Sequence, residues 1–153
     1  MPSWKYSVKG LDPDKTAIAS GRDLSIKPKA AREICNQLKG KKLERAKNIL
    51  NDVIELKQPI PYTRYNKKLP HRNGIKSYDA GRYPVKASEE ILKILYSVEA
   101  NAEFKGLYSD QLVITHIACH RGRKIRNYIP RAFGRASPYF KNLTHIEVVV
   151  EEI

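Results

Sequence analysis

The sequence predicts an α+β fold in which three helices pack against antiparallel strands and two strands extend as a long, basic β-hairpin. Three segments carry apolar residues at helical spacing, and two later segments alternate apolar and polar residues with the two-residue period of a strand. The residues that link those two strands are rich in Arg and Lys and contain no acidic residue. At 153 residues, the chain suits a single domain with one modest core.

The first helix is expected from Pro28 to Lys39. Proline is well suited to the first turn of a helix, and Gly40 is a typical signal for its end. Between them lies one apolar face, made by Ala31, Ile34, Cys35 and Leu38.

The second helix must end before Pro59 and Pro61, which lack the amide hydrogen that a helix interior requires. Its apolar face consists of Leu43, Ala46, Ile49, Leu50 and Val53. The third helix is expected to begin at Pro84 and to end at Gly106. Its apolar face consists of Ala87, Ile91, Ile94, Leu95, Val98 and Ala102.

Two strands are expected after the third helix, and we predict that they pair antiparallel. One begins near Gln111, with Leu112, Ile114, His116 and Ala118 on one face. The other runs from Thr144 to Glu151, with Ile146, Val148 and Val150 on one face. A weaker pattern over residues 16–20 indicates a short strand before the first helix. These arms and the three helical faces are expected to contain the core.

The net charge of +13 indicates a polyanionic partner or an acidic surface. All of the excess positive charge lies in two segments. Residues 111–146 carry seven basic residues and no acidic one, and the Lys57–Lys86 segment carries eight basic residues against Asp79 alone. The rest of the chain has 14 basic and 15 acidic residues. Solvated surfaces normally mix the two signs, so two single-sign segments favour binding, although charge alone does not separate RNA from DNA or anionic lipid.

The basic hairpin is too long to remain within the body. The 15 residue-to-residue steps from Ala118 to Phe133 would span about 50 Å as a strand, whereas a domain of this size has a radius of gyration of about 15 Å. Folding back would bury several Arg and Lys side chains in a stretch that offers no acidic partner. We therefore expect the hairpin to project into a polyanion.

Arginine-rich composition and interleaved aromatic residues are typical of nucleic-acid contacts, because guanidinium groups bind phosphates and rings stack on unpaired bases. Gly122 and Gly134 either allow close approach to a phosphate or are ordinary turn glycines. The aromatic candidates are Tyr128, Phe133, Tyr139 and Phe140. The expected RNA-binding residues are Arg64, Lys67, Lys68, Arg72, Lys76 and Arg82 in the first segment, and Arg121, Arg123, Lys124, Arg126, Arg131, Gly134, Arg135 and Lys141 in the second.

An enzyme is not expected, because no phosphate-binding glycine loop, nucleophile elbow or pair of catalytic acids occurs. His116 and His120 would lie about 13 Å apart along a strand, too far to share a zinc ion. We therefore expect no catalytic residue, metal or cofactor. Cys35 and Cys119 are expected to be buried, reduced thiols. No apolar run approaches the roughly 18 residues of a membrane span, so a cytoplasmic location without membrane contact is expected.

The segment from Ile129 to Ala136, followed by Thr144 to Val150, resembles the universal large-subunit ribosomal protein twenty-two family, whose eukaryotic members are called L-seventeen. Residues 28–42 resemble its first helix and the following turn, and residues 100–103 match its third helix. The resemblance covers nearly the whole chain. Residues 58–83 are an insertion relative to the short bacterial form and resemble archaeal and eukaryotic members, so an archaeal source is expected.

The resemblance implies one domain over residues 1–153, with three helices on a three-stranded antiparallel sheet. The body would comprise about 1–118 and 142–153, with the basic insertion at about 58–83 and the extended hairpin at about 119–141. The implied role is structural: binding ribosomal RNA beside neighbouring proteins of the large subunit and supporting its assembly in the cytoplasm. A free-standing nucleic-acid regulator or a chromatin protein remains the alternative, and cofractionation with the large subunit would separate the two.

In the resembled family, the hairpin lines the peptide exit tunnel, which would bring its tip close to the nascent peptide. Carried over by position, the tip covers about residues 125–136. The expected tip residues are Ile125, Tyr128, Arg131, Phe133, Gly134 and Arg135.

Overall fold

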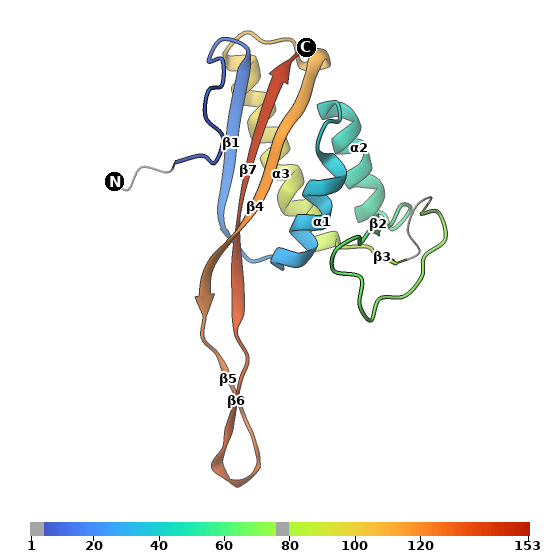
Figure 1. Ribbon diagram of the computed structural model, residues 1–153, viewed down its shortest axis with the longest axis vertical. Coiled ribbons are helices and arrows are strands. Elements are labelled where there is room, and N and C mark those ends of the chain that lie inside the picture. The colour runs from blue at the N-terminus through green and yellow to red at the C-terminus, as the bar shows by residue number, and fades with distance from the viewer. Residues whose placement is uncertain (1–4, 76–79) are drawn as a thin grey trace.

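A computed structural model describes residues 5–75 and 80–153 (Figure 1). Lys76, an expected RNA contact, and Asp79 lie outside the described residues. Along the chain, the elements are β1 (Thr16–Leu24), α1 (Pro28–Leu38), α2 (Leu43–Ile54), β2 (Ile60–Pro61), β3 (Gly81–Arg82), α3 (Val85–Phe104), the 3₁₀ turn η1 (Ser109–Gln111), β4 (Leu112–Ile125), β5 (Tyr128–Pro130), the 3₁₀ turn η2 (Ala132–Gly134), β6 (Ala136–Pro138) and β7 (Lys141–Glu152).

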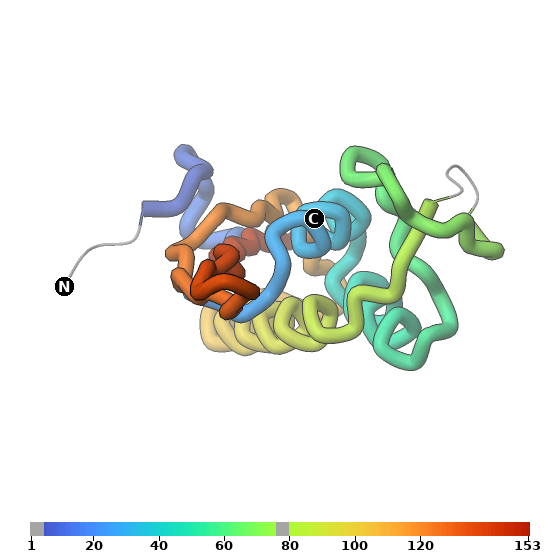
Figure 2. The backbone as a smooth tube through the Cα atoms, turned by 90° about the horizontal axis from the view of Figure 1, so that it is seen from below, coloured from blue at the N-terminus to red at the C-terminus, as the bar shows by residue number. Residues whose placement is uncertain are grey.

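The main sheet has three antiparallel strands in the order β1, β7, β4. Helices α1 and α3 pack on this sheet, and α2 packs on α3 (Figures 1 and 2). The predicted α+β class, the three helices and the antiparallel pairing of the last two long strands are therefore confirmed. Two short antiparallel pairs, β2 with β3 and β5 with β6, add to the expected arrangement.

Helices α1 and α3 begin and end within two residues of their expected limits, and α2 ends at Ile54, before Pro59 as expected, because apolar spacing, proline and glycine act locally. Each residue of the predicted apolar faces is buried. Gly40 ends the α1 region in a left-handed conformation, at φ +75°, and its N–H donates to the carbonyl of Ile114 at 2.8 Å. That bond fixes the end of α1 against β4.

Strand β1 is longer than the pattern over residues 16–20 predicts, because β7 offers it a partner as far as Thr144, which lies opposite Leu24. A register shift lies between Gly21 and Leu24. Gly21 faces α3 closely: a Cβ atom there would lie 2.6 Å from Cδ1 of Ile94. The glycine therefore lets the helix pack against the strand.

Strand β4 changes the face that it buries, which strict alternation does not predict. A bulge shifts the pairing between Ile114, which lies opposite Val150, and His116, which lies opposite Val149. Because an extra residue moves all following side chains to the other face, Ile117 is buried in place of His116 and Ala118. The expected face of four residues is therefore wrong beyond Ile114.

The two cysteines are free thiols, with Cys35 buried and Cys119 half-buried. A hydrogen bond with Cys119, together with burial, raises the pKa of Cys35 well above its ordinary value, which keeps this thiol protonated. Across residues 5–75 and 80–153, no helix has both the length and the apolar character needed to cross a bilayer.

Candidate nucleic-acid interface

The far parts of β4 and β7, with β5 and β6 between them, form a two-stranded extension that projects from the lower end of the body (Figure 1). The last residues that pair between β4 and β7 are Ile125 and Lys141, which lie opposite each other. After a break in the strand pairing, β5 pairs with β6. Tyr128 lies opposite Pro138, and Pro130 lies opposite Ala136. Ile125 thus lies well before the turn, whereas the other expected tip residues lie at or near the far end.

The turn at the far end is held by Arg131, whose N–H donates to the carbonyl of Arg135 at 2.7 Å. Within it, Phe133 takes a left-handed conformation, at φ 58°, followed by Gly134 at φ 64°. Positive φ is costly for a bulky residue, so this turn stores local strain. Phe133 is 92% exposed within this turn.

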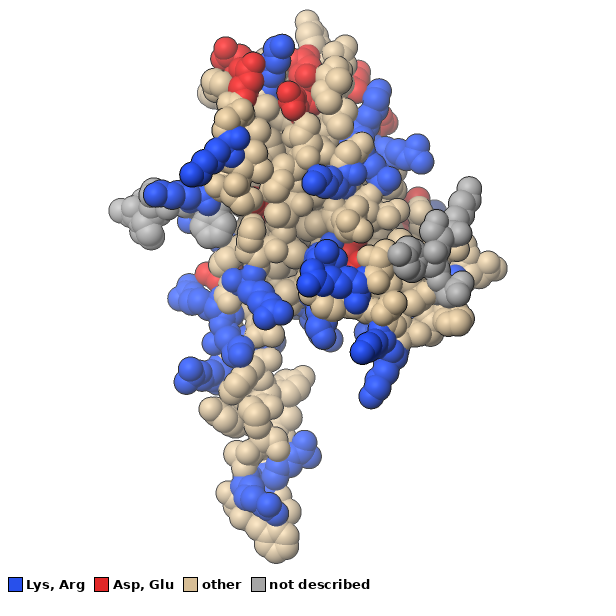
Figure 3. All heavy atoms as spheres, viewed as in Figure 1, with Lys and Arg blue, Asp and Glu red and all other residues tan. Residues whose placement is uncertain are grey.

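The basic residues predicted to bind RNA are exposed, apart from Lys76, whose position is not described. Figure 3 shows Lys and Arg side chains on the extension and on the lower body, while acidic side chains gather at the opposite end. On this face the acidic side chains are therefore concentrated at one end, whereas the cations continue onto the extension. A polyanion would meet the extension end first.

Arg123 has an acidic partner, although the sequence analysis expected none for the basic stretch. Its Nη2 donates to Oδ2 of Asp23 at 3.0 Å, and this hydrogen bond lowers the pKa of Asp23. The carboxylate comes from β1, which lies outside the acid-free stretch. Arg123 remains exposed and is neutralised at the root of the extension, so it is a weaker candidate for a phosphate contact than the other cations.

Aromatic rings line the extension together with the cations. Tyr128, Tyr139 and Phe140 are exposed, and the rings of Tyr128 and Phe140 meet edge to face with centroids 5.7 Å apart. Lys124 lies over the Phe140 ring, with Nζ 5.4 Å from its centroid. These pairs hold rings and charges at fixed positions, which suits stacking on unpaired bases.

Gly122 is not a turn glycine. It lies inside β4, and a Cβ atom there would lie 3.1 Å from Cε1 and Nε2 of His145 and 3.2 Å from the backbone of Leu143. Close packing across the strand pair explains this glycine. Gly134 alone of the two has the positive φ of a turn.

The basic insertion is fastened to the body by Glu33, a buried residue of α1 that sequence patterns did not single out. One oxygen, Oε1, accepts hydrogen bonds from the N–H groups of Arg64 and Tyr65, each at 3.1 Å. The other, Oε2, accepts from the N–H and the hydroxyl of Thr63, at 3.2 and 3.1 Å. The carboxylate therefore sets the direction of the backbone that carries Arg64. The sequence signal that could have identified Glu33 is a charged residue placed among the apolar residues of this helix.

The insertion also contributes to the core, through the buried residues Ile60 and Tyr62. Gly81 packs against the same strand, because a Cβ atom there would lie 3.1 Å from the carbonyl of Ile60. The expectation that the helical faces and the long strands contain the whole core is thus incomplete. The base of the insertion is structural, and its outer loop carries the charge.

His116 and His120 converge on one carboxylate, contrary to the separation expected along the strand. Oε1 of Glu147 lies 3.1 Å from Nε2 of His116 and 3.3 Å from Nε2 of His120. Long side chains that lean toward a residue on the neighbouring strand close the gap that the backbone leaves. No group of three or more candidate metal ligands occurs within the described parts of the chain.

Glu147 is also bound by the N-terminal segment. The N–H of Ser7 donates to Oε2 at 3.2 Å, and the Ser7 hydroxyl donates to Oε1. Burial alone would raise the pKa of Glu147, but the hydrogen bonds from Ser7, His116 and His120 outweigh it and lower the pKa below its ordinary value of 4.5. This carboxylate holds the N-terminal segment on the outer face of the sheet.

Replacing Glu147 with Gln is expected to reduce the free energy of unfolding at pH 7 by about 1–2 kcal/mol, because charged hydrogen bonds are lost. A lowered folded-state pKa stabilises the protein above the unfolded pKa, and that contribution disappears as the pH falls through the folded value. The difference between wild type and Glu147→Gln should therefore shrink below pH 4.5. Urea unfolding at pH 7, 5 and 3.5 measures it, and a constant difference across these values would contradict the assignment.

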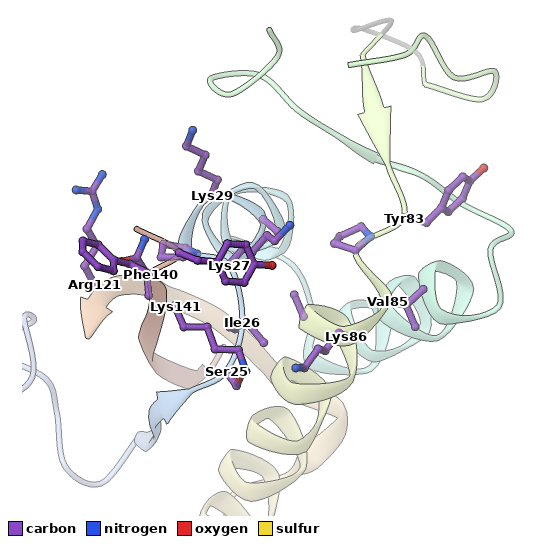
Figure 4. A pocket seen from close by; sticks show the side chains of 16 residues that line it. Ser25, Ile26, Lys27, Lys29, Tyr83, Val85, Lys86, Arg121, Phe140 and Lys141 are labelled. Atoms are coloured by element: carbon purple, nitrogen blue, oxygen red, sulfur yellow. The ribbon is translucent and has the colours of Figure 1, made fainter. Parts of the chain in front are cut away.

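A cavity of about 930 Å³ lies where the extension meets the body (Figure 4). It joins the root of the extension to the beginning of α1 and to the end of the insertion at the beginning of α3. Its cations are Arg121 and Lys141, which were expected RNA contacts, Lys86, which ends the basic Lys57–Lys86 segment, and Lys27 and Lys29, which the sequence did not single out. Segments distant in the sequence form this cavity, so no local pattern could reveal it.

Comparison with known proteins gives a consistent result over the length of the chain. A family model described as ribosomal protein L22p/L17e matches residues 19–151. The large ribosomal subunit protein uL22 of Thermofilum pendens is 49% identical over 153 residues, which cover 100% of this chain and 99% of that protein. The uL22 protein of Methanopyrus kandleri is 52% identical over 152 residues, covering 97% and 96%. That of Archaeoglobus fulgidus is 49% identical over 151 residues, covering 99% and 97%.

Proposed function

Because this chain belongs to the ribosomal protein L22p/L17e family and is a structural component of the large ribosomal subunit, we propose that it binds ribosomal RNA through two basic surfaces and lines the peptide exit tunnel with its tip. The first surface is the insertion and the second is the extension, a long β-hairpin. The observation that carries the proposal is the exposed, mostly unpaired positive charge on a two-stranded arm that projects beyond the body.

The insertion and the extension have different roles in binding. The insertion is anchored to the core through Glu33 and Tyr62, so its cations are presented from a rigid base that suits docking. No residue from Cys119 to Lys141 is buried, and this part of the chain is stabilised mainly by the pairing of its own strands. Ribosomal RNA on both sides would supply the partners that the chain itself does not provide.

The far turn is the part of the arm that would reach the tunnel. Phe133 is exposed in this turn, and the Arg135 guanidinium lies 5.9 Å from its ring centroid; Arg131 begins the same turn. A ring and two cations could narrow an RNA-walled passage and meet a nascent peptide there. Neighbouring proteins of the large subunit would contact the body.

Deleting Ile125 to Ala136 is expected to leave most of the ribosomal occupancy intact, because the insertion and the root of the extension keep their cations. The same deletion should alter stalling on a tunnel-sensing peptide and the response to tunnel-binding antibiotics. Ribosomes carrying the full-length or the deleted chain are compared for occupancy and for both responses. Lost occupancy would make the tip an anchor, and unchanged occupancy with unchanged responses would remove its tunnel role. Phe133→Ala, which keeps the arm and its charge, isolates the contribution of the ring.

A further inference from the structure

The geometry of the cavity at the root of the extension points to a binding site for one unpaired nucleotide of ribosomal RNA, an inference that rests on the proposed function and names the ligand of one part of it. The cavity is formed by three parts of the chain: residues 25–30, residues 83–87, and Arg121 with residues 139–142. Its volume of about 930 Å³ lies within the range of small-molecule pockets, roughly 300–1,000 Å³.

The charge around the cavity has one sign. Five exposed cations and no acidic residue contribute to its described lining, and none of the five makes an ion pair with another described residue. Figure 4 shows that these side chains come from separate elements of the fold that line the cavity. Unpaired cations from three segments of the chain meet an anion without rearrangement of the fold. The five are Lys27, Lys29, Lys86, Arg121 and Lys141.

The two helices that begin at the cavity add to the positive electrostatic potential of its cations. Neither α1 nor α3 has a side-chain cap or an acidic residue in its first turn. The N–H of Val85 at the beginning of α3 donates to the carbonyl of Tyr83 at 3.0 Å, but the positive ends of both helix dipoles are left without a negatively charged partner. A phosphate near Lys27 or Lys86 would supply it.

The walls are apolar and aromatic as well as charged, which distinguishes a nucleotide from a free anion. Tyr139 and Phe140 are exposed at the extension side, and Tyr83, Pro84 and Val85 form part of the opposite side. A base needs such ring and aliphatic surfaces for stacking, whereas its phosphates need the cations. A regular duplex keeps its bases stacked inside, so an unpaired nucleotide fits the concave site better.

The position of the cavity favours RNA over an acidic peptide. It lies between the end of the insertion and the root of the extension, which are the two surfaces proposed to bind ribosomal RNA. An RNA strand that runs from one surface to the other would pass the mouth of the cavity. A single nucleotide turned inward would then fix the angle at which the extension leaves the body.

The test uses the full-length chain bound to protein-free large-subunit RNA, with affinity measured across a range of salt and with chemical probing of unpaired bases. Phe140→Leu keeps an apolar side chain and removes the ring, and we expect about tenfold weaker binding with an unchanged salt slope. Lys86→Gln should lower the magnitude of the slope by about 0.7–0.9 for one lost phosphate contact. Both variants should restore the reactivity of the same nucleotide, while Phe140→Tyr should keep it protected.

Matched controls are Phe104→Leu, at an exposed ring near the end of α3, and Lys93→Gln, on the same helix as Lys86; neither should change the footprint. Wild-type footprints for both Phe140→Leu and Lys86→Gln would overturn the nucleotide site while leaving the proposed function standing. Normal binding to bare RNA but lost occupancy in assembled subunits would instead identify a neighbouring protein as the occupant and overturn the proposal. Failure of the wild-type chain to bind the RNA would reject the proposed function itself.

Discussion

Binding of the full chain to large-subunit RNA is expected to weaken by about 10³-fold to 10⁵-fold when monovalent salt rises from about 50 to about 200 mM, as for proteins with about six to ten phosphate contacts. The excess charge is concentrated on exposed side chains of the insertion and the extension. Each phosphate that a cation neutralises releases condensed counterions, and added salt opposes that release. Filter binding or fluorescence anisotropy across this range gives the slope of log affinity against log salt.

Variants show which cations contribute to the slope. Arg64→Gln together with Lys67→Gln should reduce its magnitude by about 1.4–1.8, at about 0.7–0.9 per contact. Lys93→Gln removes a charge that is already paired with Glu90, at 2.9 Å, and should leave the slope unchanged. Arg123→Gln should have a smaller effect than Arg126→Gln, because Asp23 already neutralises Arg123. A wild-type slope near zero would refute phosphate contact as the source of affinity.

Replacing Glu33 with Ala is expected to lower the free energy of unfolding by about 3 kcal/mol, because three backbone N–H groups lose a charged acceptor in a shielded place. The Glu33 side chain has no exposed surface, so water does not replace it without local opening. The insertion should then detach from α1. Urea unfolding measures the loss, and amide exchange of residues 60–75 reports the opening.

Thr63→Val is the matched control, because it removes the hydroxyl that donates to Glu33 and leaves all three backbone bonds in place. Its expected cost is about 1 kcal/mol, with exchange protection of residues 64–65 retained. If Glu33→Ala unfolds like the wild type, the carboxylate does not fasten the insertion. A loss of stability without faster exchange in residues 60–75 would assign Glu33 to the stability of α1 instead.

The sequence alone determined the features that depend on local patterns. Apolar spacing with Pro28, Gly40 and Pro59 located the helices, since burial of one helix face repeats every three to four residues. Alternation located the two long strands, and the acid-free basic stretch between them indicated a projecting arm and a polyanionic partner. The family resemblance depended on Ile129 to Ala136, a segment of that arm, because the motif is continuous in the chain.

Only the tertiary structure decided which distant side chains meet. The bulge in β4 arises from its pairing with β7, and it buries Ile117 where alternation placed His116. Glu33 binds the backbone thirty residues further on, and His116 joins His120 at Glu147, because packing brings separate segments together. The cavity between the extension, α1 and α3 has the same origin. A sequence pattern reports whether a residue faces the core or water, whereas the identity of its neighbour depends on how the whole chain packs.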